Sequence, residues 1–272
     1  FIKKTEKEFG ASNDLLIMQK EIYRLQGDFN RAKKICEKLV SISPKNYNIL
    51  AELYMHFSDY ENAIKSYKEL LKEEPQNPEA IVALYQIYVN KKDIKNQEVF
   101  LLKMAKSLDI NIEIKKEVFY NILINDSFHE FTSFMSIINE LIKIHPEEPL
   151  FNLIIGDLYA KEELFQKSLK HYRATLNTGV VKDDYVYTKM IEIYWQQKDF
   201  LNVSIVSLDA IERFPIKPRF YYYKALADSQ NKKYEESIQA LLKGKDFIFD
   251  NDMLLSDFFS LMGDAYHDLK KH

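Results

Sequence analysis

Residues 44–75 read PKNYNILAELYMHFSDYENAIKSYKELLKEEP, and this stretch decides the fold. Its apolar residues recur at spacings of three and four on both sides of Asp59-Tyr60, which is typical of two amphipathic helices joined by a short turn. Pro44 and Pro75 stand at its two ends, where proline fits a helix start or stop but not a helix interior. The stretch therefore predicts a hairpin of two helices, each of roughly 12 to 15 residues.

The same hairpin signal recurs along the chain. Three Pro-x-x-Pro groups, at 75–78, 146–149 and 215–218, lie 71 and 69 residues apart. A second marker is a residue pair that precedes each apolar run. The second members of successive pairs lie 31 to 37 residues apart, and they are Phe29, Tyr60, Ile94, Phe131, Phe165, Phe200 and Tyr234. The period predicts repeats at about 13–43, 44–77, 78–112, 113–148, 149–183, 184–217 and 218–252, with a partial repeat at 253–272.

The composition limits the classes of protein. The 38 Lys and Arg residues nearly balance 41 Asp and Glu residues, so there is no bulk basic field for a nucleic acid. Six Gly and seven Pro are too few for a turn-rich β fold, and no apolar run is long enough to span a membrane. The single cysteine, Cys36, lies on an apolar helical face and is expected to be an inert, buried side chain.

These repeats resemble the tetratricopeptide repeat, whose period is about 34 residues. The residues of the second hairpin that match its pattern of large, small, aromatic and proline positions are Leu50, Ala51, Tyr54, Tyr60, Ala63, Tyr67 and Pro75. The resemblance implies an all-α, right-handed superhelix of antiparallel helix pairs, about 7.5 repeats long, that forms one domain over residues 1–272. Small residues, namely Ala32, Ala63, Gly156 and Gly263, are expected where the two helices of a pair approach closely.

The repeat at 113–148 departs from the pattern, because bulky Ile122 and Phe134 stand where small residues are expected. Sequence drift is the favoured interpretation. The alternative is a wider junction that splits the solenoid into residues 1–112 and 113–272. A solenoid normally ends in a polar capping helix, and the chain stops where the second helix of its last repeat should begin, so we expect it to be part of a longer polypeptide.

Signatures of enzymes are missing from the sequence. It has no Gly-rich phosphate loop, no His-x-x-x-His pair and no cysteine cluster, so we expect no catalytic residue, metal or cofactor. Two other functions stay open: a helical regulatory part of a larger enzyme, and, less favoured, an RNA-binding helical-repeat protein. Richness in Lys, Asn, Ile, Tyr and Phe suits an AT-rich bacterial genome, and both the cytoplasm and a bacterial periplasm are compatible with the sequence.

The resemblance also implies where a partner binds, because the first helix of each repeat in this family lines a concave groove. The groove residues carried over in this way, with aromatic anchors and acidic neighbours, are Phe119, Asp157, Tyr185, Glu192, Trp195 and Tyr222. For Trp195 the alternative, given equal weight, is that its ring only covers the turn at Gln196-Gln197. The prediction is a non-catalytic scaffold that binds a protein or peptide, with no role in nucleic-acid binding.

Overall fold

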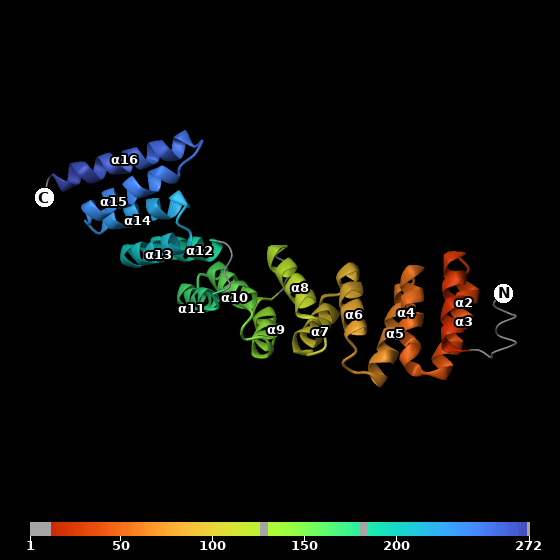
Figure 1. The fold of residues 1–272 in the computed structure, drawn as a ribbon. Coiled ribbons are helices and arrows are strands. Elements are labelled where there is room, and N and C mark those ends of the chain that lie inside the picture. The colour runs from red at the N-terminus through yellow and green to blue at the C-terminus, as the bar shows by residue number, and fades with distance from the viewer. Residues whose placement is uncertain (1–11, 126–129, 180–183, 271–272) are drawn as a thin grey trace. The chain divides into compact units, whose positions relative to one another are not determined.

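The computed structural model describes residues 12–125, 130–179 and 184–270, and in these ranges it contains α-helices, two short 3₁₀ helices and no strand (Figure 1). The predicted all-α class is therefore confirmed. Contacts divide the chain into two compact units, residues 1–145 and 146–272. The right-handed twist and the single-domain organisation stay predictions.

The first unit consists of helices that pack in consecutive antiparallel pairs, α2 on α3, α4 on α5 and α6 on α7. Its elements are α2 (Asn13–Leu25), α3 (Phe29–Ile42), the 3₁₀ helix Pro44–Asn46, α4 (Tyr47–His56), α5 (Tyr60–Glu73), α6 (Pro78–Lys91), α7 (Ile94–Lys106), α8 (Ile112–Ile124) and α9 (Phe131–Ile144).

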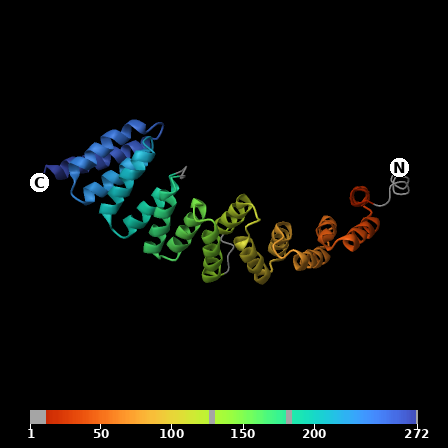
Figure 2. The same ribbon diagram turned by 60° about the horizontal axis from the view of Figure 1, so that its bottom comes forward.

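The second unit repeats the arrangement, with α10 on α11, α12 on α13 and α14 on α15, and α16 packs against α15 (Figure 2). Its elements are α10 (Pro149–Lys161), α11 (Phe165–Asn177), α12 (Tyr185–Gln196), α13 (Phe200–Arg213), α14 (Pro218–Gln230), α15 (Tyr234–Gly244), the 3₁₀ helix Lys245–Phe247 and α16 (Asp252–Leu269).

Where the repeated marker pair begins with Asp, that residue caps the helix that follows. An Asp59 carboxylate oxygen accepts a hydrogen bond from the Asn62 backbone N–H at 3.2 Å, and the Asn62 Nδ2 donates to the other oxygen at 2.7 Å. The same pair of bonds joins Asp93 to Asn96 and Asp199 to Asn202. Such a cap typically contributes about 1 kcal/mol, which explains why the marker begins the second helix of these hairpins.

Small residues let the paired helices approach closely. Ala63 is fully buried between α4 and α5, and the Ser168 hydroxyl donates to the Gly156 carbonyl oxygen at 2.8 Å between α10 and α11. A Cβ atom on Gly263 of α16 would meet no atom within 4 Å, so the close approach expected at this position stays a prediction. In the described part of the chain no second helix packs on that exposed face of α16.

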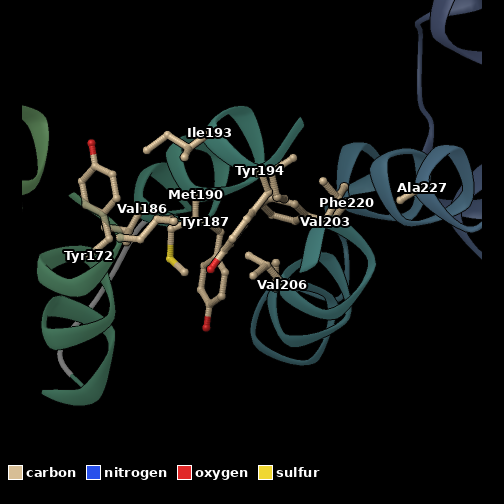
Figure 3. Close-up of a cluster of buried hydrophobic side chains, with 13 residues drawn as sticks. Tyr172, Val186, Tyr187, Met190, Ile193, Tyr194, Val203, Val206, Phe220 and Ala227 are labelled. Carbon is tan, nitrogen blue, oxygen red and sulfur yellow. The ribbon is translucent and has the colours of Figure 1, made fainter. Parts of the chain in front are cut away.

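Buried aromatic and aliphatic side chains from successive hairpins form the core of the second unit (Figure 3). Tyr172 of α11, Tyr187 and Met190 of α12, Val203 of α13 and Phe220 of α14 are all nearly inaccessible to solvent. Each hairpin thus covers the apolar face of the next, as expected of a helical repeat. The core holds α12 and α14 in fixed positions on neighbouring hairpins.

The repeat at 113–148 packs with large side chains. The rings of Phe119 in α8 and Phe134 in α9 stack with centroids 5.9 Å apart, and Ile122 is also buried. Helix α9 packs against α7, so this repeat belongs to the first unit. The alternative boundary at 112/113 is therefore wrong, since the division falls after His145.

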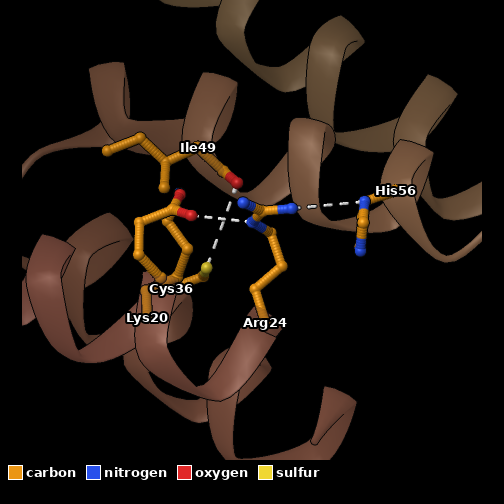
Figure 4. A network of polar contacts seen from close by, with 6 residues as sticks. Lys20, Arg24, Cys36, Ile49 and His56 are labelled. Carbon is orange, nitrogen blue, oxygen red and sulfur yellow. Dashed lines mark hydrogen bonds and ion pairs between the residues drawn. The ribbon is translucent and has the colours of Figure 1, made fainter. Parts of the chain in front are cut away.

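Cys36 is fully buried in α3, as expected, and its thiol faces the Ile49 carbonyl oxygen at 3.9 Å (Figure 4). Burial raises the pKa of this thiol to about 11, so it stays protonated and unreactive near neutral pH. In the same region Arg24 of α2 binds Glu21 at 2.7 Å and reaches the His56 Nδ1 of α4 at 3.4 Å. These contacts join the first two hairpins.

Candidate functional site

A hollow of about 510 Å³ lies between α12 and α14 of the second unit. Its walls are Ile191, Glu192, Trp195 and Gln196 of α12 and Tyr223 and Leu226 of α14. We call this set of residues the α12/α14 pocket. Its volume falls in the range of typical ligand sites, about 300 to 1,000 Å³.

Trp195 lines the α12/α14 pocket, and its ring packs against Phe200. Its indole meets the Phe200 ring edge to face, with centroids 5.0 Å apart, and the side chain remains 37% exposed. Phe200 lies at the start of α13, beyond the turn at Gln196-Gln197, so the alternative that the Trp195 ring covers that turn stays a prediction. The indole also lines the pocket. A rigid aromatic side chain that is already ordered loses little conformational entropy when it binds.

Glu192 supplies the negative charge of the pocket. Its carboxylate forms an ion pair with Lys189, one turn away, at 2.8 Å, and both side chains are substantially exposed. An exposed pair of this kind is worth about 0 to 1 kcal/mol, so it does not commit the carboxylate to Lys189. A cationic group of a ligand can therefore replace Lys189 at Glu192.

Asp157 and Tyr185 are brought together, but not at the pocket. The Asp157 carboxylate accepts hydrogen bonds from the hydroxyls of Tyr172 at 2.6 Å and Tyr185 at 3.2 Å. Burial raises the pKa of Asp157, and the two hydroxyls and Lys189 partly oppose that effect. Tyr185 stays 39% exposed and its ring lies beneath the Lys189 ammonium. Asp157 therefore links α10, α11 and α12.

Two more of the predicted groove residues, Phe119 and Tyr222, also lie outside the pocket. Phe119 is 0% exposed and stacks on Phe134, so it cannot contact a partner, and its prediction is wrong. Helix α8 begins at Ile112, and the Asn111 side-chain oxygen accepts a hydrogen bond from the Glu113 backbone N–H at 2.8 Å. The Tyr222 ring is half-buried against Phe258 of α16, with centroids 5.5 Å apart, and is not part of the pocket wall.

Tyr223, the next residue, lines the pocket and was missed by the sequence prediction. Three tyrosines follow one another at 221–223, and neighbouring helical residues point about 100° apart, so an error of one position selects the wrong ring. The apolar spacing of Ile191 and Trp195, four residues apart on α12, is the signal that could have identified this face.

The described residues hold no group of three His, Cys, Asp or Glu side chains placed to bind a metal ion. In the same ranges, none of the helices combines the length and the apolar character that crossing a membrane requires.

Comparison with known proteins finds a family match in part of the first unit. Residues 21–46 and 45–77 match the model of the tetratricopeptide repeat family. No curated protein sequence matches the chain. The matched residues begin in the last part of α2 and continue through α3 and the whole α4/α5 hairpin, including the capped turn at Asp59.

Solved structures with a similar fold include the APC/C hetero-tetramer Cut9-Hcn1, at 11% identity and a TM-score of 0.41 over 97% of this chain and 51% of that one. This chain thus spans about half the length of that relative. MamA matches at 20% identity and a TM-score of 0.38, over 59% of this chain and 94% of that one. A tetratricopeptide repeat protein from Parabacteroides merdae ATCC 43184 matches at 13% identity and a TM-score of 0.34, over 97% of this chain and 90% of that one. The chain is a helical-repeat protein whose residues 21–46 and 45–77 are similar to the tetratricopeptide repeat.

Proposed function

We propose that the chain is a non-catalytic interaction scaffold that holds an apolar side chain of a protein partner in the α12/α14 pocket. The tetratricopeptide repeat generally serves protein–protein interaction, which supports this class of function. The observation that carries the proposal is the combination of Trp195, Tyr223 and Leu226 around one 510 Å³ hollow with the Glu192 carboxylate at its wall. Aromatic anchors of this kind dominate the energetics of protein interfaces.

The chemistry of the pocket specifies the segment it accepts. Apolar walls favour a Leu, Met or aromatic anchor, because burying such a side chain gains about 1.5 to 3 kcal/mol. Glu192 favours a Lys or Arg next to that anchor, since opposite charges at an interface rim select the partner and its orientation. The proposed ligand is thus a peptide segment with a large apolar residue flanked by a basic one.

A peptide library displayed on phage and selected on the full chain tests this proposal. The selected sequences are expected to share an apolar residue beside Lys or Arg. The Trp195→Ala/Tyr223→Ala double variant is expected to bind them at least about 30-fold more weakly, because truncating an anchor costs about 2 kcal/mol and tenfold in affinity is about 1.4 kcal/mol.

Two further variants complete the test. Tyr266→Ala, at an exposed position of α16, is the matched control and is expected to bind like the parent chain. Glu192→Lys is expected to reject the basic peptides while keeping the fold, because the side chain is exposed. Selected peptides that bind the double variant with unchanged affinity would contradict the proposal.

A further inference from the structure

A second hollow, of about 220 Å³, lies in the second unit between α11 and α13, which are the second helices of two neighbouring hairpins. We call it the α11/α13 hollow. Two of its lining residues, Met190 of α12 and Val206 of α13, are buried in the core (Figure 3). The hollow is smaller than typical ligand sites, which measure about 300 to 1,000 Å³, so it suits one side chain of a larger partner. The α12/α14 pocket, by contrast, lies between first helices.

An exposed apolar stripe of α13 passes this hollow. Leu201, Ile205 and Leu208 are 55%, 55% and 47% exposed, and Ile205 also lines the hollow. Their spacing of four and three residues places them on one face of the helix. Leu176 of α11 adds an apolar side chain from the other side of the hollow. A stripe with this spacing has the length and shape that an amphipathic helix of a partner covers.

The two sides of the hollow carry opposite charge. The charged residues of α11 are Lys167, Lys170 and Arg173, all of them cationic and exposed, and Arg173 lines the hollow. From α13, Asp209 lines the hollow and Glu212 follows three residues later on the same helix, and both are exposed. A partner that lies along the hollow therefore meets cations on its α11 side and carboxylates on its α13 side.

Tyrosine hydroxyls hold the two charged groups that line the hollow. Arg173 Nη2 donates a hydrogen bond to the Tyr194 hydroxyl, and the Tyr187 hydroxyl donates to the Asp209 carboxylate at 2.9 Å. Within the described part of the chain, neither Arg173 nor Asp209 forms an ion pair. A hydroxyl orients a charged group without neutralising it, so both charges stay available to a partner in fixed positions.

The geometry points to a docking site for one amphipathic helix of a partner protein, with its apolar stripe against Ile205 and the neighbouring leucines. One flank of that helix carries Asp or Glu toward α11, and the other flank carries Lys or Arg toward Asp209 and Glu212. Opposite charges at the edge of an interface select the partner and fix its orientation. The site uses second helices and is separate from the α12/α14 pocket.

A membrane surface is the competing partner, because exposed apolar side chains beside Lys and Arg also suit an anionic lipid surface. Asp209 and Glu212 disfavour it, since their carboxylates would face the same negative headgroups as the α11 cations. A protein helix can turn a different flank toward each side of the hollow. The pair of opposite charges therefore favours a helix.

The test selects ligands on the full chain from a phage-displayed library of 18-residue helical peptides. Leu is fixed at positions with alternating spacings of four and three, the two flanks of that stripe are varied among Glu, Lys and Gln, and the remaining positions are Ala. The selected peptides are expected to carry Glu on one flank and Lys on the other. The affinity of the best one is then measured by calorimetry.

Two variants of the chain test the apolar stripe and the charges. Ile205→Gln/Leu208→Gln changes two exposed positions to a residue that favours helix, and its affinity for the selected peptide is expected to fall at least about 30-fold, as when an interface anchor is removed. Lys170→Glu/Arg173→Glu makes both sides of the hollow negative. A second selection on that variant is expected to recover peptides with Lys on both flanks.

The controls separate this site from the rest of the chain. Val99→Gln, at an exposed apolar position of α7, is expected to leave the affinity unchanged. Trp195→Ala/Tyr223→Ala is expected to bind the selected peptide normally, so this site and the α12/α14 pocket can fail separately. Circular dichroism of each variant checks that the helices are retained.

The inference is overturned if no peptide is selected, if the selected flanks show no preference for opposite charges, or if Ile205→Gln/Leu208→Gln binds as tightly as the parent chain. Two other occupants would also overturn it. One is a membrane, if the chain sediments with phosphatidylserine vesicles and this variant does not. The other is a second copy, if light scattering shows a dimer of the parent chain that the same variant abolishes.

Discussion

Gly156→Ala places a methyl group where the structure has no room for one. A Cβ atom built on Gly156 of α10 lies 2.5 Å from Cε1 and 2.6 Å from Cδ1 of the Tyr172 ring in α11. Carbon atoms in contact normally lie about 3.5 to 4.0 Å apart, so the ring or the helix must move by about 1 Å. The ring is fully buried and its hydroxyl donates to Asp157 at 2.6 Å, which leaves it no easy direction to move.

The magnitude follows from two opposing effects. Overpacking a core costs about 1 to 3 kcal/mol, and the pinned ring places this site near the upper end of that range. Replacing a helical glycine with alanine returns about 1 kcal/mol. The variant is therefore expected to lose about 2 kcal/mol in the free energy of unfolding of the second unit, measured by urea denaturation and circular dichroism of the full chain.

Gly263→Ala is the matched control, because a Cβ atom at this helical position meets nothing within 4 Å. It is expected to gain about 0.5 to 1 kcal/mol from helix propensity alone. Hydrogen exchange should show faster exchange in α10 and α11 of Gly156→Ala and little change in the first unit. A Gly156→Ala chain as stable as the parent would refute the close approach of these helices.

Three other outcomes follow from the packing and from the pKa values. Phe119→Ala is expected to cost about 3 to 5 kcal/mol in the first unit, by urea denaturation, and to leave peptide affinity at the α12/α14 pocket unchanged. Burial raises the pKa of Asp157, so the folded chain keeps the proton of this carboxyl to higher pH than the unfolded chain does. The free energy of unfolding therefore falls as the pH rises from the ordinary pKa of Asp, about 3.9, through the pKa of Asp157 in the folded chain. Asp157→Asn should flatten that slope in denaturation curves across this range, and an unchanged slope would count against the burial of the carboxyl. Cys36, with its pKa at about 11, should resist a thiol reagent at pH 8 until urea unfolds the first unit, and rapid labelling of the native chain would contradict its burial.

The hairpins were predictable because local chemistry marks them. Asp59, Asp93 and Asp199 cap their helices through bonds to a residue three positions later, and prolines stand at the first position of α6, α10 and α14. These signals need no information about the rest of the chain, so the sequence alone predicted the all-α class and the helix pairs.

The direction of side chains was harder to predict for helices that lack a capping aspartate or a proline at their start. The helix at 112–124 has no proline or aspartate at its start. Phe119 of this helix was predicted to line the groove, but its ring is buried against Phe134. At Tyr222 and Tyr223, composition cannot distinguish two identical neighbours, and only the packing of Phe258 on Tyr222 decides which ring lines the pocket. The division at 145/146 likewise depends on tertiary contacts between α7 and α9.

Trp195 is the only tryptophan of the chain and lies in the α12/α14 pocket, so its fluorescence tests the central claim directly. The measurement is a titration of the parent chain with a selected peptide that lacks tryptophan, recording the emission maximum and quenching by acrylamide. A ligand anchor in the pocket removes water from the half-exposed indole, so emission should shift to shorter wavelength and quenching should weaken as the peptide saturates. A peptide that binds to saturation by calorimetry while the emission and quenching of Trp195 stay unchanged would contradict the account.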